Sequence, residues 1–165
     1  MKQLLIIRHA KSSWDFSTPN DFERPLNERG HNDAPAMAKR LLHKNILIDA
    51  FISSPAKRAF TTATYFAETY GSSKKNIIAV KELYHASPKT FYEIISNTAD
   101  ALHTIAVFSH NPSITEFVNK LTNTHIDNMP TCGIFAVTIK TDSWKNFATA
   151  EKIFLFFDYP KNINP

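Results

Sequence analysis

Short apolar runs alternate along this chain with longer segments in which apolar residues recur every three or four positions. The runs are short and rich in β-branched residues, which is typical of strands buried in a sheet. The longer segments have the spacing of amphipathic helices. We predict strands at 4–7, 46–53, 77–80 and 104–108. We predict a first helix that residues 27–30 lead into and that ends near 43–45, and further helices at 57–70, 89–101 and 113–121. Strands that alternate with helices predict a three-layer α/β/α sandwich with a mostly parallel sheet.

The last third of the chain changes period. Two strand-like runs, 133–139 and 152–157, flank a turn at 141–145, so we expect an antiparallel pair at the edge of the sheet. Gly71 is expected to end the second helix, and Pro35 is expected in the first turn of the first helix, where its missing N–H does no harm. Residues 12–26 are predicted to form a loop. With no repeat and no linker composition, residues 1–165 are predicted to form a single domain.

Composition narrows the functional classes. The net charge of +4 is mildly basic, but the Lys and Arg residues form no long block, so nucleic acid is not expected as a partner. A single cysteine, Cys132, excludes an intramolecular disulfide. No apolar run is long enough for a membrane span or a signal-peptide core, and the cytoplasm is the expected compartment. The histidines show no metal-ligand spacing, so neither a metal nor a cofactor is expected.

The first strand ends in the pair Arg8-His9, and this position is chemically informative. In open α/β sheets, ligands bind at the carboxyl ends of the strands. The Arg guanidinium offers a fork of donors that suits a phosphate, and the His imidazole offers a nitrogen nucleophile. A salt-bridged Arg and a packed His would explain the pair alone equally well.

Two further stretches follow predicted strands. They are Ser54-Pro55-x-x-Arg58-Ala59-x-x-Thr62-Ala63 and Ser109-His110-Asn111-Pro112. Together with Arg8-His9, they resemble the motifs of the histidine phosphatase superfamily, also called the phosphoglycerate mutase-like family. Within that family the sequence is most similar to the small SixA-type phosphohistidine phosphatases. The resemblance covers residues 3 to about 158.

The resemblance implies a role for each matching residue. His9 would be the nucleophile that forms a transient phosphohistidine, Arg8 and Arg58 would hold the phosphoryl group, and His110 would bind its oxygens. Ser12 and Arg24 would be further phosphate ligands, although a salt bridge within the loop would explain Arg24 nearly as well. Ala10 replaces the usual Gly of the family, and this is tolerable only if its φ is negative.

A general acid for the leaving group is a weaker prediction. Glu82 follows the third predicted strand, and Asp15 is a second candidate, but a solvated surface residue explains Glu82 as well. A phosphohistidine substrate can leave as imidazole with its own proton, and then no acid is needed.

The resemblance implies a phosphatase that acts through His9, and we expect its substrate to be phosphohistidine in a protein. Only residues 83–104 separate the third and fourth strands, so an open site is predicted. A small phosphoester is the alternative substrate, and a phosphate-binding module without turnover is the third possibility. The sequence makes no prediction of the oligomeric state.

Overall fold

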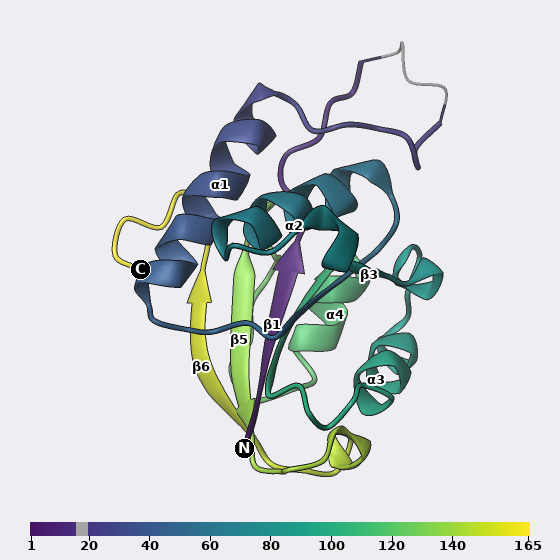
Figure 1. The fold of residues 1–165 in the computed structure, drawn as a ribbon, viewed down its shortest axis with the longest axis vertical. Helices are drawn as coiled ribbons and strands as arrows, with labels where there is room; N and C mark the ends of the chain where they lie inside the picture. Colours follow the sequence, from purple (N-terminus) through teal and green to yellow (C-terminus); the bar gives the residue numbers. More distant parts are fainter. Residues whose placement is uncertain (16–19) are drawn as a thin grey trace.

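A computed structural model describes residues 1–15 and 20–165, so residues 16–19 of the predicted loop lie outside the described part. The described residues form one six-stranded sheet flanked by helices (Figure 1). The strands are β1 (Lys2–Arg8), β2 (Ala50–Ser53), β3 (Ile78–Ala79), β4 (Thr104–Ser109), β5 (Ile134–Ile139) and β6 (Lys152–Asp158). The α-helices are α1 (Glu28–His43), α2 (Lys57–Thr69), α3 (Pro88–Ser96) and α4 (Ser113–Val118), and the 3₁₀ turns are η1 (Lys74–Asn76), η2 (Lys81–Leu83) and η3 (Trp144–Asn146).

The strand order is β3-β2-β4-β1-β5-β6. Strands β1 to β4 run parallel, whereas β5 is antiparallel to both of its neighbours, β1 and β6. This confirms the prediction of a mostly parallel sheet with an antiparallel edge. The central strand β1 pairs with β4 on one side and β5 on the other, so its residues form two complete ladders.

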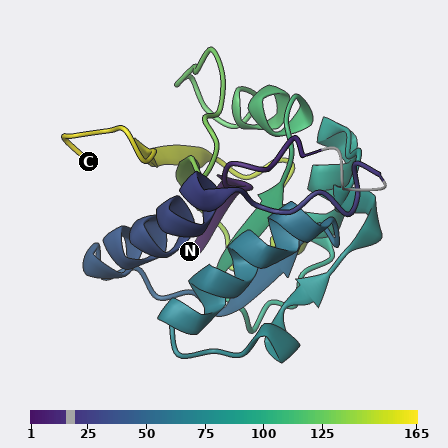
Figure 2. The same ribbon diagram turned by 90° about the horizontal axis from the view of Figure 1, so that it is seen from above.

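The side chains of β1 alternate between two hydrophobic layers. Leu4 and Ile6 pack with α3, α4 and Trp144, whereas Leu5 and Ile7 pack with α1 and α2. All four side chains are buried, as expected for a strand covered on both faces. Figure 2, seen from above, shows α1 and α2 on one side of the sheet and α4 on the other, which is the predicted three-layer arrangement.

Some predicted boundaries were wrong. Pro35 lies inside α1, because the helix already begins at Glu28, where the Asn27 side chain accepts a hydrogen bond from the Gly30 N–H. The prediction placed β2 four residues too early. The Asp49 carboxylate accepts the backbone N–H groups of His103 and Thr104, and the chain pairs with β4 as a strand only from Ala50 onward. Helix α3 is also shorter than predicted and ends at Ser96.

The carboxyl ends of β1, β2 and β4 lie at the same edge of the sheet, at the upper end of Figure 1. Backbone hydrogen bonds join the three chain segments just beyond it, since His9 N–H donates to Ser109 O at 3.2 Å and Ser54 N–H to Phe108 O at 3.0 Å. The candidate site is built on this edge. Within the described residues, no helix is long and apolar enough to cross a bilayer.

Candidate active site

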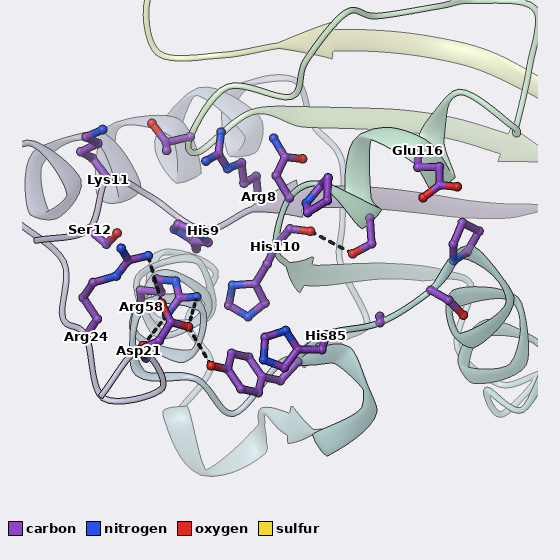
Figure 3. A pocket seen from close by; sticks show the side chains of 18 of the residues that line it. Arg8, His9, Lys11, Ser12, Asp21, Arg24, Arg58, His85, His110 and Glu116 are labelled. Carbon is purple, nitrogen blue, oxygen red and sulfur yellow. Dashed lines mark hydrogen bonds and ion pairs between the residues drawn. The ribbon is translucent and has the colours of Figure 1, made fainter. Parts of the chain in front are cut away.

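The structure brings Arg8, His9, Arg58 and His110 to the wall of one cavity at this sheet edge, with a volume of about 820 Å³ (Figure 3). Arg8 ends β1 and His9 follows it, Arg58 lies in the first turn of α2, and His110 follows β4. Three separate segments of the chain therefore supply the four side chains, as the strand order requires.

The backbone of Arg8 and His9 is fixed from the side of β5. Cys132 has a positive φ of 59°, and its N–H donates to the carbonyls of Arg8 and His9 at 3.1 and 3.0 Å. The Arg8 guanidinium donates through Nη1 to Met129 O at 2.8 Å. On the other side, Ala10 N–H donates to Thr62 Oγ1 at 2.9 Å. These bonds hold the nucleophile candidate in one orientation.

The hydrogen bond of His9 identifies its reactive nitrogen. Nδ1 lies 2.7 Å from the Ala10 carbonyl oxygen, which can only accept, so Nδ1 carries the proton and Nε2 keeps its lone pair. Burial lowers the pKa of His9 to about 3, and the nearby charges of Arg58, Arg8 and Arg24 act in the same direction, against the bond to Ala10. His9 is therefore neutral at physiological pH, which is the state that a nitrogen nucleophile needs.

His110 is held by a serine from the loop after β2. Its Nε2 lies 2.8 Å from Ser54 Oγ, which also accepts the Ala56 N–H at 3.3 Å. A Ser54 hydroxyl that donates to Nε2 leaves the imidazole proton on Nδ1. Burial and the neighbouring His9 ring, with its centroid 5.2 Å away, lower the pKa of His110 to about 2. His110 is thus neutral beside the neutral His9, and in the tautomer with Ser54 donating to Nε2 its Nδ1 is a donor.

Several buried donors around His9 have no hydrogen-bond partner among the described residues. They are Arg8 Nε, Arg58 Nε, Arg24 Nε and Nη1, and His110 Nδ1. Buried donors are normally satisfied, and an oxyanion with several acceptor oxygens satisfies donors of this kind. The donor set suits a phosphoryl group, whereas no group of three or more metal-ligating side chains occurs in residues 1–15 and 20–165.

Asp21 and Tyr84 belong to the site but were missed by the sequence analysis. Asp21 accepts Arg58 Nη1 through its backbone carbonyl at 2.7 Å and Arg58 Nη2 through its carboxylate at 3.0 Å. The Tyr84 hydroxyl donates to the same carboxylate at 2.7 Å. Burial acts to raise the pKa of Asp21, but the bonds from Tyr84 and Arg58 outweigh it and lower the pKa, so this carboxyl is ionised. The only feature of the sequence that could have pointed to Asp21 was its position three residues before Arg24.

Ser12 and Arg24, the other predicted phosphate ligands, both line the cavity. Ser12 is buried and forms an isolated β-bridge with Leu26. The Arg24 guanidinium stacks on the Trp14 ring at 3.7 Å from its centroid and lies 3.5 Å from Asp21. Arg24 therefore makes the predicted salt bridge within the loop and also lines the cavity, and its role as a phosphate ligand stays a prediction.

The structure does not bring the two candidate acids to the cavity. In the described part of the chain, neither Glu82 nor Asp15 is among the lining residues. The turn η2 buries Leu83 and leaves Glu82 exposed, where it lines a separate hollow with Ile94 of α3. A different carboxyl, the exposed Glu116 of α4, lines the cavity, and Figure 3 shows it apart from His9 and Arg58.

Close packing fixes the loop after His9. Asn27 N–H donates to Lys11 O at 3.0 Å, and a Cβ added to Gly30 would lie 2.1 Å from that same oxygen. Only glycine lets the start of α1 approach the loop this closely. Ala10 is not among the described residues with a positive φ, so it replaces the usual glycine without backbone strain.

Comparison with known proteins agrees with this geometry. The model of the histidine phosphatase superfamily (branch 1) matches residues 4–87. An uncharacterised chloroplastic protein of Arabidopsis thaliana is 28% identical over 153 residues, covering 87% of this chain and 69% of its own. Phosphoserine phosphatase 1 of Hydrogenobacter thermophilus is 33% identical over 84 residues, covering 50% of this chain and 36% of its own.

The solved structures share the whole fold. A protein histidine phosphatase SixA in complex with tungstate has a TM-score of 0.81 at 21% identity, with 96% of this chain and 97% of the other covered. A protein of Agrobacterium tumefaciens described as a phosphohistidine phosphatase SixA has a TM-score of 0.78 at 22% identity, covering 96% and 98%. The fold is therefore phosphoglycerate mutase-like. Because the family model matches more than half of this chain, the chain belongs to the histidine phosphatase superfamily and is a hydrolase of the histidine-nucleophile phosphatase class.

Proposed function

We propose that His9 is the nucleophile and that it carries the phosphoryl group between two displacements. In the first, the Nε2 lone pair attacks phosphorus, an Nε2–P bond forms, and the bond from phosphorus to the leaving group breaks. In the second, water attacks phosphorus, the Nε2–P bond breaks, and inorganic phosphate is released. The neutral state and the fixed tautomer of His9 support this role.

The unpartnered donors would stabilise the charge on the transferring phosphoryl group. Arg8, Arg24 and Arg58 supply guanidinium N–H groups, and His110 supplies Nδ1–H. We include the Ser12 hydroxyl because the residue is buried at the cavity wall. Donors fixed in place before the reaction contribute most to such transition states. Asp21 would act on Arg58 by holding Nη1 and Nη2 so that Nε faces the phosphoryl group, and Tyr84 would hold the Asp21 carboxylate in place.

We further propose that the substrate is a phosphohistidine in a protein, and one observation carries this: among residues 1–15 and 20–165, no carboxyl beside His9 is available to donate a proton. Asp21 is kept ionised by Tyr84 and Arg58, whereas Glu82 and Asp15 are not among the residues that line the cavity. An alkyl phosphate leaves as a strongly basic alkoxide, which needs a proton from the enzyme. The imidazole of phosphohistidine can leave with a proton that it already carries.

The shape of the cavity supports a protein substrate. Its volume of about 820 Å³ is far larger than a phosphoryl group requires, and between β3 and β4 the chain contains only η2, α3 and their connections. A histidine side chain on a protein surface can enter such a site. Of the solved structures with the same fold, one is described as a phosphohistidine phosphatase SixA and another as a protein histidine phosphatase SixA, which also supports the proposal. The cytoplasm, expected from the sequence, is the compartment that we propose.

A small phosphoester remains the alternative substrate, and Glu116 is the observation that favours it. This carboxyl lines the cavity, and an exposed carboxyl can protonate an alkoxide if the substrate extends to it.

A substrate panel separates the two. We expect kcat/KM to be highest for a phosphohistidine protein, lower for phosphoserine and sugar phosphates, and unchanged by Glu116→Gln on phosphohistidine. A preference for a small phosphoester that Glu116→Gln abolishes would contradict the proposed substrate.

A further inference from the structure

A second cavity adjoins the active site. It has a volume of about 440 Å³ and shares Arg8, Lys11 and Thr131 with the first cavity. Its outer part is built from Arg29 and Asp33 of α1, and from the segment after β6 that contains Tyr159 and Lys161. We call it the basic side pocket. The proposed phosphatase chemistry uses none of these outer residues.

The charge of the basic side pocket is strongly one-sided. Four of its lining residues are cationic, namely Arg8, Lys11, Arg29 and Lys161, and only Asp33 is anionic. Asp33 is already paired with Arg29, with 3.6 Å between its Oδ2 and Arg29 Nε. After this pairing, the lining keeps an excess of positive charge from Arg8, Lys11 and Lys161, so the pocket attracts an anionic group.

The outer wall of the basic side pocket is held in place by a partly buried ion pair. Arg40 Nη1 donates to Asp158 Oδ1 at 2.9 Å, and Asp158 is buried at the end of β6. The same guanidinium donates to the carbonyls of Tyr159 at 3.2 Å, Pro160 at 3.3 Å and Asn162 at 3.1 Å. One arginine therefore fixes the backbone on both sides of Lys161.

The inner wall is fixed as well. Arg29 Nη2 donates to Thr131 Oγ1 at 3.3 Å, and Thr131 is next to Cys132, whose N–H holds the carbonyls of Arg8 and His9. The pocket is therefore preformed and connected to the phosphate site through Arg8. A preformed site loses little conformational freedom when a ligand binds.

We propose that the basic side pocket binds a carboxylate of the protein substrate that lies close to its phosphohistidine. This inference rests on the proposed function and names the part of the substrate that it did not specify. The phosphoryl group itself is bound by the donors around His9, so an anion in the adjoining pocket must come from another part of the substrate. Charge complementarity of this kind selects a partner and speeds its encounter.

Charge reversal of Lys161 tests the proposal. Lys161 is exposed and its side chain makes no hydrogen bond or ion pair within the described residues, so Lys161→Glu should leave the fold intact. The matched control is Lys145→Glu in η3, which is also exposed and lies at the opposite end of the sheet. The two substrates are a phosphohistidine phosphotransfer domain with acidic residues beside its histidine, and phosphoimidazole, which has no carboxylate.

We expect Lys161→Glu to raise KM for the phosphorylated domain about tenfold, to reduce its dependence on salt, and to leave kcat and all phosphoimidazole kinetics unchanged. The Lys145→Glu control should match the wild type on both substrates. Arg29→Gln should act like Lys161→Glu, and replacing the acidic residues of the domain by amides should abolish the difference between Lys161→Glu and the wild type.

Two results would overturn the inference alone. One is an unchanged KM for the phosphorylated domain, and the other is an equal loss on phosphoimidazole, which would mean that Lys161 affects the phosphate site itself. If the wild type hydrolyses neither phosphohistidine substrate, the proposed function fails, and the inference fails with it.

Discussion

The two buried histidines should make the stability of this protein depend on pH. Burial lowers the pKa of His9 to about 3 and that of His110 to about 2, from an ordinary value of 6.5. Because the folded pKa values are depressed, the unfolded chain takes up protons that the folded protein does not. The stabilisation is complete above pH 6.5 and is lost as the pH falls toward the folded values.

The size of the effect follows from linkage. Between pH 6 and pH 5, each histidine that titrates only in the unfolded state lowers the free energy of unfolding by about 1.2 kcal/mol, so the two together contribute about 2.4 kcal/mol. Ordinary carboxyl groups contribute little in this window because they remain ionised in both states. His9→Asn and His110→Asn should each remove half of the effect, and the double variant should remove all of it.

The assay is urea denaturation at several pH values in a buffer without phosphate. Each substitution also changes the absolute stability, so only the change between pH 6 and pH 5 is compared across variants. Orthophosphate should raise the stability of the wild type at both pH values, because it binds the folded donors only. A pH dependence that is the same in the wild type and in both single variants would refute the neutral, buried state of these imidazoles.

Three further predictions concern Arg58, Gly30 and Glu82. Arg58→Ala should lower kcat/KM by roughly 10²–10³, the cost of one transition-state donor. Steady-state kinetics in which both Arg58→Ala and Arg58→Lys kept full activity would contradict the role of Arg58. Gly30→Ala should lower the free energy of unfolding by about 1–3 kcal/mol, because the added Cβ meets the Lys11 carbonyl oxygen at 2.1 Å; a chemical denaturation curve equal to that of the wild type would refute this packing. Glu82→Gln should change activity on phosphohistidine by well under tenfold, since Glu82 lies outside the cavity, and a loss of about 10² or more, typical of a general acid, would show that Glu82 acts there after all.

The sequence predicts the layers of this fold well because they depend on local patterns. The apolar run from Leu4 to Ile7 and the helical spacing of α1 and α2 are visible in single segments, and the structure has these elements. The end of a strand also places Arg8, His9 and His110 at one sheet edge without knowledge of any contact. The resemblance to a family then added Arg58, Ser12 and Arg24, all of which line the same cavity.

The sequence fails where a position depends on contacts between distant segments. Asp21 contacts Arg58 and Tyr84, which are 37 and 63 residues away along the chain, and no local pattern indicates such contacts. Glu82 was proposed as an acid because it follows a strand, but β3 has only two residues and η2 then turns Leu83 inward instead. Ser54 was quoted within a motif, yet its bond to His110 depends on the pairing of β2 with β4.

The central claim is that His9 carries the phosphoryl group, and trapping the intermediate tests it most directly. The protein is mixed with ³²P-labelled phosphohistidine substrate, quenched in alkali within one turnover, and digested for mass spectrometry. We predict an acid-labile, alkali-stable label on His9, no label in His9→Asn, and a label that persists in His110→Asn. A label on another residue, or turnover that survives in His9→Asn, would contradict the account.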